Sequence, residues 1–330
     1  MNNFLKIHSS CFIVYGASNG VIYDLRRGVL YPIPNSFLKI LQEYENVEFS
    51  KLLVDYNAQS AILNKYLNFL FENEIIFLTS TPINFPKINT NFRKPFILDI
   101  VLLEIDNFDL TKKKLFQFNT ISQIGCSELI LISKQDSSKD IEEILKLLND
   151  SKIQSVICLI NFDFFSSDTI DKLTNNYLRI REVVVYNCIN EIIVDNKIVR
   201  FTSDSLQELF SKKISNTDDF VPNLDSYVES QSFNLFFNRR IYIDNDNNVK
   251  HSYNDTTVFG NLNKQTINQI ISSTNLTSLW KINKDRIKVC KDCEFRYVCP
   301  DNRIPVFDKI SNLYDHIDQC NYNPYTNQWK

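Results

Sequence analysis

Glycine and histidine are scarce in this chain of 330 residues, which contains five glycines and three histidines. With so few glycines, neither G-x-G-x-x-G nor G-x-x-x-x-G-K-S/T can be written, so the usual phosphate-binding loops are missing. The G-x-S-x-G nucleophile motif is missing too. The histidines are scattered through the sequence, at His8, His251 and His316. A nucleotide-binding enzyme or a hydrolase with a histidine base therefore has no support.

Long apolar runs and a positive charge excess are also lacking. The longest apolar runs, such as residues 97–105, are short and interrupted by acids, so no membrane-spanning segment is expected. The net charge of −3 gives no sign of a nucleic-acid surface. The N-terminus has no apolar signal-peptide core, so the eight cysteines are expected to be reduced thiols in the cytoplasm.

Four of the eight cysteines gather in the last quarter of the chain. Cys290 and Cys293 form a C-x2-C pair, Cys299 follows after five residues, and Cys320 after a further twenty. C-x2-C is about the tightest spacing that lets two thiolates bind one metal. The other two cysteines complete a four-thiolate site, which suits tetrahedral zinc or a [4Fe–4S] cluster. We therefore predict a metal centre at these four residues.

The spacing favours the iron–sulfur cluster over zinc, which stays the alternative. Structural zinc ribbons usually have two close cysteine pairs, and this chain has one. Nearby cations would offset the negative charge of four thiolates: Lys288, Lys291, Arg296 and Arg303. His316 could replace one thiolate, although a histidine on a helix or loop is the simpler reading. Loss of the metal is expected to unfold the C-terminal region and leave residues 1–80 folded.

Residues 1–80 show an ordered pattern of three strands followed by three helices. The strands are expected at 11–15, 21–25 and 29–32, and the helices from 35 or 36, within 49–57 and at 60–73. A strand at 75–78 follows. The third helix should bury one face formed by six apolar side chains: Ile62, Leu63, Tyr66, Leu67, Leu70 and Phe71.

This order, together with the phrase Val-Ile-Tyr-Asp-Leu-Arg-Arg-Gly-Val-Leu-Tyr, resembles a small winged-helix element of the PqqD-like type. The resemblance implies that residues 1–80 bind the leader of a precursor peptide. The leader would add a strand to an exposed sheet edge, and its alternate side chains would fill a groove beside the third helix. Candidate contact residues are Tyr23, Leu30 and Tyr31. The alternative is a plain packing module in which these residues belong to the core or the surface.

After a linker at 79–94, strands alternate with helices. Strands are expected at 96–104, 129–133, 155–160 and 182–186, with helices at 110–124, 139–149 and 168–177. A hairpin would join 192–194 to 197–201. This alternation predicts a mainly parallel sheet, open or partly closed as a barrel. The remaining cysteines lie in or beside strands and are expected to be buried small apolar residues: Cys11, Cys126, Cys158 and Cys188.

Residues 236–330 resemble a SPASM domain, the auxiliary-cluster domain of peptide-modifying radical S-adenosylmethionine enzymes. The resemblance rests on a strand, an Asp/Asn-rich turn at 244–248, a Phe-Gly-Asn-Leu step at 259–262, a helix and C-x2-C-x5-C with a distant cysteine. Full SPASM domains bind two clusters. Other residues stand where ligands of the first are expected: Lys250-His251-Ser252, Gln265 and Arg303. The resemblance therefore implies one cluster.

The radical S-adenosylmethionine motif, C-x3-C-x2-C, is missing. Residues 97–110 contain no cysteine, and Cys126, Cys158 and Cys188 are separated by 31 and 29 residues. No S-adenosylmethionine is therefore expected, and residues 95–235 resemble a degenerate radical-SAM-like α/β barrel that lost its chemistry.

The whole combination resembles the SPASM-domain peptide maturases of grasp-with-spasm systems. Two phrases carry this resemblance: Cys-Lys-Asp-Cys-Glu-Phe-Arg-Tyr-Val-Cys-Pro-Asp-Asn-Arg and Cys-Asn-Tyr-Asn-Pro-Tyr-Thr-Asn-Gln-Trp. It implies an α/β chain with a PqqD-like domain (1–80), a barrel (95–235) and a SPASM domain (236–330). It also implies a precursor peptide and an ATP-grasp ligase as partners. A non-catalytic role is favoured. The alternatives are an iron–sulfur enzyme that itself modifies the peptide, or a zinc-stabilised adaptor.

Overall fold

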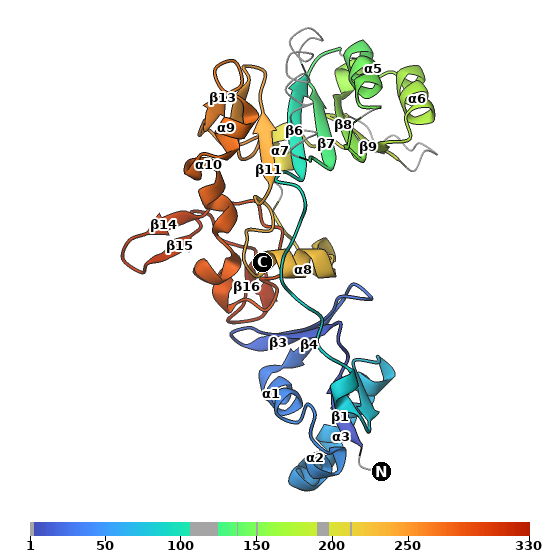
Figure 1. Cartoon of the computed structure of the whole chain (residues 1–330), viewed down its shortest axis with the longest axis vertical. Coiled ribbons are helices and arrows are strands. Elements are labelled where there is room, and N and C mark those ends of the chain that lie inside the picture. The colour runs from blue at the N-terminus through green and yellow to red at the C-terminus, as the bar shows by residue number, and fades with distance from the viewer. Residues whose placement is uncertain (1–2, 106–124, 137, 150, 190–197, 212) are drawn as a thin grey trace. The chain divides into compact units, whose positions relative to one another are not determined.

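The computed structural model describes residues 3–105, 125–136, 138–149, 151–189, 198–211 and 213–330. The chain divides into two compact units (Figure 1). Unit 1 contains Met1–Phe92, Lys213–Leu235 and Ile282–Lys330, and unit 2 contains Arg93–Lys212 and Phe236–Lys281. The segment 236–330 is thus shared between the units, and its cysteine-bearing part belongs with the N-terminal residues. The division into 1–80, 95–235 and 236–330 stays a prediction.

Unit 1 opens with two small antiparallel sheets and three helices. One sheet pairs β1 (Phe4–Ile7) with β5 (Ile76–Thr79). The other is a meander of β2 (Cys11–Tyr15), β3 (Asn19–Asp24) and β4 (Val29–Pro34). The helices are α1 (Asn35–Glu43), α2 (Phe49–Asp55) and α3 (Ser60–Glu72). The order of three strands and three helices expected from the sequence is confirmed, and the short strand β1 is an addition.

The β2–β3–β4 sheet is buried on both faces, because successive residues of a strand point to opposite sides. Ile22 of β3 packs with the helices, in one core with Leu38 and Leu67. Val21 and Tyr23, its neighbours, belong to a second core on the opposite face. In α3 the buried stripe runs through Leu63, Leu67 and Leu70. Ile62, which we expected on that face, lies one position outside the stripe and is 64% exposed.

The second core joins the N-terminal sheet to the cysteine-bearing segment of unit 1. Its buried members come from three stretches far apart in sequence: Val14, Val21, Tyr23, Leu25, Phe220, Tyr227, Val228, Phe295, Val298 and Tyr322. Cys293, Cys299 and Cys320 pack against it. Helix α8 (Leu224–Ser230) supplies Tyr227 and Val228 of the middle stretch, and Phe220 precedes it. The cysteine segment therefore shares a hydrophobic core with residues 1–80.

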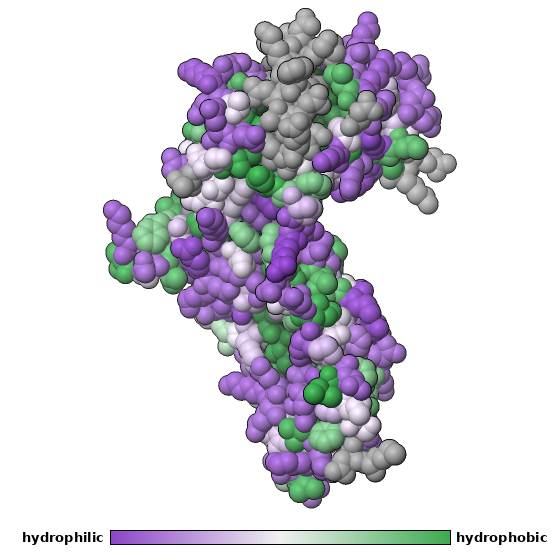
Figure 2. Space-filling view, viewed as in Figure 1, coloured by the Kyte–Doolittle hydropathy of each residue, from purple (hydrophilic) through white to green (hydrophobic). Residues whose placement is uncertain are grey.

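Two hairpins complete the C-terminal part of unit 1. They pair β14 (Val306–Asp308) with β15 (Leu313–Asp315), and β16 (Tyr322–Asn323) with β17 (Gln328–Trp329). The β14–β15 hairpin carries exposed apolar side chains, and Figure 2 shows green surface on it; Phe307 is 46% and Ile310 is 98% exposed. Its base is bound to Lys288, whose backbone N–H donates to Tyr314 O over 2.8 Å and whose ammonium lies 2.6 Å from Asp308. This contact fixes the chain just before Cys290.

Unit 2 is built on an eight-stranded sheet in the order β10-β9-β8-β7-β6-β11-β12-β13. The strands are β6 (Ile100–Ile105), β7 (Glu128–Ser133), β8 (Ser155–Asn161), β9 (Ile180–Tyr186), β10 (Val199–Phe201), β11 (Arg240–Ile243), β12 (Asn248–Lys250) and β13 (Gly260–Asn261). Pairing from β10 to β11 is parallel, and β12 and β13 are antiparallel. The expected mainly parallel sheet is confirmed, and continuous apolar runs such as Leu129–Ile132 are typical of such strands.

The helices of unit 2 are α5 (Ser138–Leu147), α6 (Ser167–Asn176), α7 (Leu206–Ser211), α9 (Ile267–Ile271) and α10 (Thr274–Ser278). Leu206, Leu209 and Phe210 pack on one sheet face, against residues such as Ile132 and Tyr186. The expected helix at 110–124 and the hairpin strand at 192–194 lie outside the described residues. None of the described helices has the length and apolar character needed to cross a membrane.

Candidate metal centre

The four cysteines predicted as metal ligands line one cavity in unit 1. Cys290 begins a short 3₁₀ turn that ends at Asp292, Cys293 and Cys299 follow it, and Cys320 precedes β16. All four are free thiols. The volume of this cavity is about 40 Å³. This small, sulfur-lined space suits an inorganic group and is too small for a peptide.

The backbone around the cysteines is shaped to present their sulfurs. Val289 adopts φ 61° and ψ −50°, and the Cys290 N–H donates to Lys288 O over 2.6 Å, which together make a γ-turn. A β-branched residue rarely adopts positive φ, so this turn is strained. The backbone N–H of Phe295 donates to Cys293 Sγ over 3.4 Å. The backbone N–H of Tyr322 donates to Cys320 Sγ over the same distance. Such N–H groups stabilise thiolates and tune metal–sulfur centres.

A buried ion cluster lies beside the sulfurs. Lys284, only 2% exposed, places its ammonium 2.9 Å from Asp301 Oδ2. The Arg303 guanidinium binds the same carboxylate with two hydrogen bonds of 2.8 Å. Lys284, Arg303 and Arg296 all line the cysteine cavity, whereas Lys291 pairs with Asp292. The sequence singled out Arg296 and Arg303 for this role but missed Lys284, whose burial no local pattern indicates.

Burial keeps Cys290, Cys293 and Cys299 protonated when no metal is bound. It raises the pKa of Cys299 to about 12 and that of Cys293 well above the usual value, and it raises the pKa of Cys290 against the opposing effect of the Lys284 ammonium. A buried thiolate is stable only beside a compensating cation. A metal ion that displaces the protons supplies this charge, and the donor set therefore fits a sulfur-ligated metal centre.

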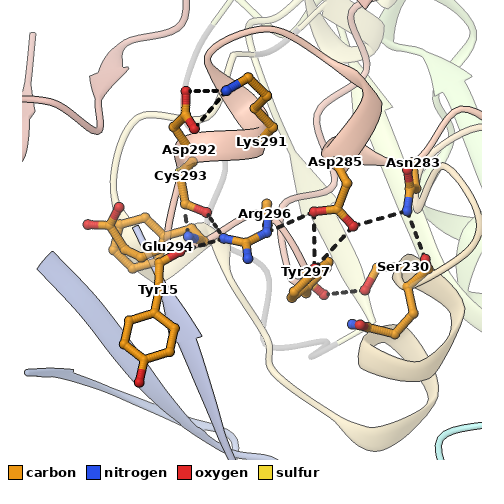
Figure 3. Close-up of polar contacts among 12 residues, drawn as sticks. Tyr15, Ser230, Asn283, Asp285, Lys291, Asp292, Cys293, Glu294, Arg296 and Tyr297 are labelled. Carbon is orange, nitrogen blue, oxygen red and sulfur yellow. Dashed lines mark hydrogen bonds and ion pairs between the residues drawn. The ribbon is translucent and has the colours of Figure 1, made fainter. Parts of the chain in front are cut away.

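The loop between Cys293 and Cys299 is bonded to the N-terminal sheet. The Tyr23 hydroxyl donates to Glu294 O over 2.6 Å. Arg296 Nη1 donates to Tyr15 O over 2.7 Å and to Cys293 O over 2.9 Å, and Figure 3 shows this guanidinium between them. The N–H of Ala17 donates to Asp292 O over 2.7 Å.

Gly16 makes this close approach possible. A Cβ atom at Gly16 would lie 2.6 Å from Glu294 Oε2 and 2.9 Å from Glu294 Cβ, both below van der Waals contact. The turn between β2 and β3 is therefore fitted against the residue that follows Cys293.

The three candidate peptide-binding residues lie on different faces of the β2–β3–β4 sheet. Tyr23 is fully buried, and Leu30, its partner across the strands, packs in the same core near the cysteines. Tyr31 faces the helices, where its ring meets Phe69 of α3 edge to face at 5.7 Å. Val29 and Phe69, which the sequence did not single out, are each 38% exposed. Tyr31 is thus the only one of the three beside α3.

His251 stands where the SPASM resemblance predicts a ligand of the first cluster, but its side chain has other partners. His251 of unit 2 is buried, with Nδ1 3.1 Å from Asp255 Oδ2 and Nε2 2.8 Å from Leu276 O. The four cysteines outside the cluster are buried, as expected: Cys11, Cys126, Cys158 and Cys188.

No family model and no curated protein matches this chain. Two solved structures align with most of it. The crystal structure of Streptococcus suis SuiB has 10% identity and a TM-score of 0.36, covering 89% of this chain and 94% of that chain. The structure of the same protein bound to S-adenosylmethionine has 10% identity and a TM-score of 0.31, covering 90% and 95%. Both TM-scores are below 0.5, and we draw no functional conclusion from them.

Proposed function

We propose that this chain is a non-catalytic maturation partner for a ribosomally made precursor peptide. It binds the leader through its N-terminal sheet, carries one [4Fe–4S] cluster at Cys290, Cys293, Cys299 and Cys320, and assists an ATP-grasp ligase that modifies the peptide. The observation that carries this proposal is that the four cysteines line one cavity whose loop is bonded to the sheet.

The surroundings of the sulfurs support a cluster. Four thiolates bring a large negative charge into a half-buried site, and four cations line the same cavity: Lys213, Lys284, Arg296 and Arg303. When bound, the cluster would supply four metal–sulfur bonds, which cross-link two turns and the segment before β16. Metal binding contributes about 10–16 kcal/mol to folding in small zinc domains. The first role of the metal is therefore to hold this part of unit 1 together.

The β4 edge supports leader binding. Among the described strands, β4 pairs only with β3. Proline occurs in sheets where its nitrogen faces away from the ladder, so Pro32 and Pro34 mark the outward-facing positions, together with Leu30. This edge offers carbonyl acceptors at all three positions and an N–H donor at Leu30 alone. A leader strand would thus bind mainly through its own N–H groups, with apolar side chains placed near Tyr31 and Phe69.

The sequence favours a non-catalytic role for this chain over an enzymatic one. It has no C-x3-C-x2-C motif for S-adenosylmethionine and no phosphate-binding loop, so ligation needs a second protein. The ATP-grasp ligase is proposed from the resemblance to grasp-with-spasm maturases.

Metal analysis of protein purified without oxygen tests the centre. We expect about four irons and four sulfides per chain, with a visible absorption band that Cys299→Ser abolishes. One zinc and no iron per chain would show that the four cysteines bind structural zinc and not a cluster. No metal at all would remove the centre from the proposal.

Peptide assays test the helper role. Short peptides encoded beside the gene for this chain would be labelled and titrated with the metal-loaded protein. We expect one of them to bind, and its mass to change only when the ATP-grasp ligase is present. A mass change produced by this chain alone would make it an enzyme, and failure of every such peptide to bind would contradict leader recognition.

A further inference from the structure

His316 is a buried histidine without a hydrogen-bond partner beside the metal centre. Its side chain is 5% exposed, and neither ring nitrogen has a hydrogen bond to any residue the structure describes. It lines a second cavity of unit 1, next to the cysteine cavity, and Cys290, Cys320 and Arg303 line both. A polar ring buried in this way normally binds something.

The neighbouring carboxylate fixes which ring nitrogen carries the proton. His316 Nε2 lies 3.3 Å from Asp301 Oδ2. Asp301 also accepts hydrogen bonds from Lys284 and Arg303, so it is an ionised acceptor, and an imidazole lone pair facing it would be repelled. Nε2 therefore carries the hydrogen and Nδ1 keeps its lone pair. Metal-ligating histidines have a similar arrangement, with one nitrogen turned toward a carboxylate and the other left to bind the metal.

The distance to Cys290 is short enough for a shared metal. One ring nitrogen of His316, the Cys290 sulfur and a carboxylate oxygen of Asp301 lie within 4.8 Å of one another. A sulfur and a nitrogen on one tetrahedral zinc are roughly 3.6 Å apart, given bonds of about 2.3 and 2.0 Å. Joint binding of one zinc would require the Cys290 and His316 side chains to rotate toward each other. The other two histidines lie elsewhere, with His8 bonded to Ser10 and His251 in unit 2.

We propose that His316 is a fifth donor of the metal centre, whose Nδ1 takes the coordination position of Cys290 when that thiolate is absent or released. Five donors then serve four positions, and Cys290 is the exchangeable ligand. Cys293 and Cys299 line only the cysteine cavity, away from the imidazole, and have no substitute. This inference rests on the proposed function only in assuming that the cysteines bind a metal.

Metal content of four variants, purified without oxygen, tests the exchange: Cys290→Ala, Cys299→Ala, His316→Gln and the double variant Cys290→Ala/His316→Gln. We expect Cys290→Ala to keep most of its metal, and Cys299→Ala and the double variant to bind it at least about 10-fold more weakly. Equal loss from Cys290→Ala and Cys299→Ala would overturn the proposal. A wild-type protein without metal would instead refute the metal centre itself, and this inference with it.

Chelator challenge of the wild type and His316→Gln gives a second readout in which every cysteine is intact. Because Nδ1 recaptures the metal when Cys290 lets go, we expect His316→Gln to release metal about 10-fold faster. Asn323→Ala, which also lines the second cavity, is the control and should release metal at the wild-type rate. Equal release from wild type and His316→Gln would contradict the role of the imidazole.

Discussion

The phenol of Tyr23 donates a hydrogen bond to the main-chain oxygen of Glu294, 271 residues further along the chain. Tyr23 lies in the middle of the N-terminal sheet, and Glu294 follows Cys293. Both groups are buried, so the bond joins the sheet to the loop between Cys293 and Cys299 out of reach of water. Two other bonds, from Arg296 to Tyr15 O and from Ala17 to Asp292 O, run across the same contact.

Tyr23→Phe removes the bond and leaves the Glu294 carbonyl unpaired. We expect a loss of about 1–3 kcal/mol in the free energy of unfolding, because an unsatisfied buried acceptor keeps its full desolvation cost. Urea denaturation of the metal-loaded protein measures the change. Tyr31→Phe, on the other face of the sheet and partly exposed, is the matched control and should change stability by less than about 0.5 kcal/mol. Similar losses of unfolding free energy in both variants would show that the hydrogen bond from Tyr23 to Glu294 contributes no more to stability than the Tyr31 hydroxyl does.

Metal removal should loosen the N-terminal sheet. The sequence led us to expect residues 1–80 to stay folded without the metal. The shared core changes that expectation, because Val14, Val21 and Tyr23 lose packing partners when the cysteine-bearing segment unfolds. We expect faster hydrogen exchange at the amides of β2 and β3 in Cys293→Ala than in the wild type. The β1–β5 pair, outside that core, is the internal control, and unchanged exchange in β2 and β3 would show that the sheet folds independently.

The groove beside α3 should matter for peptide binding and leave the metal unaffected. Phe69 touches Tyr31 next to the β4 edge and is partly exposed. Phe69→Ala should weaken leader binding about 10-fold, as expected when an aromatic contact residue is truncated. Iron content should not change. Ile83→Ala, which removes an 88% exposed side chain from another part of the N-terminal region, is the control. Equal peptide affinity in the wild type and Phe69→Ala would place the leader elsewhere.

Acid should weaken unit 2 through Asp255. Burial raises the pKa of this carboxyl. Hydrogen bonds with His251 and Thr257 lower the pKa by more than burial raises it, so the net shift is downward from 3.8. A carboxyl with a lowered folded-state pKa stabilises the protein above the unfolded pKa of about 3.9, and this stabilisation is lost as the pH falls below it. Asp255→Asn should therefore cost about 1–3 kcal/mol at pH 7. The difference from wild type should shrink below about pH 4.

Asp246→Asn, in the exposed turn before β12, is the control for the pH series. It should follow the wild-type stability curve in urea at each pH. A constant difference between wild type and Asp255→Asn from pH 7 to pH 3 would show that ionisation of Asp255 does not contribute to the stability of unit 2.

Local patterns were enough to predict much of this fold. Short apolar segments bounded by turn residues predicted β2, β3 and β4, helical spacing predicted α3, and the C-x2-C-x5-C spacing located the cysteines that line the cavity. Contacts between distant segments could not be predicted in this way. Ile22 and Tyr23 lie on opposite faces of the sheet, but nothing near residue 23 in the sequence indicates that Phe295 and Tyr322 cover Tyr23. Lys284 was missed for the same reason, since its partner Asp301 identifies it only in three dimensions.

Unit 1 is assembled from both ends of the chain and the internal segment Lys213–Leu235, with the two segments of unit 2 encoded between these pieces. During synthesis the N-terminal sheet therefore leaves the ribosome long before the loop that covers it. At about 5–20 residues per second, the delay between Tyr23 and Glu294 is roughly 15–50 s. Throughout that interval one apolar face of the sheet is bare. The nascent chain thus offers a chaperone a binding surface that the finished protein does not expose.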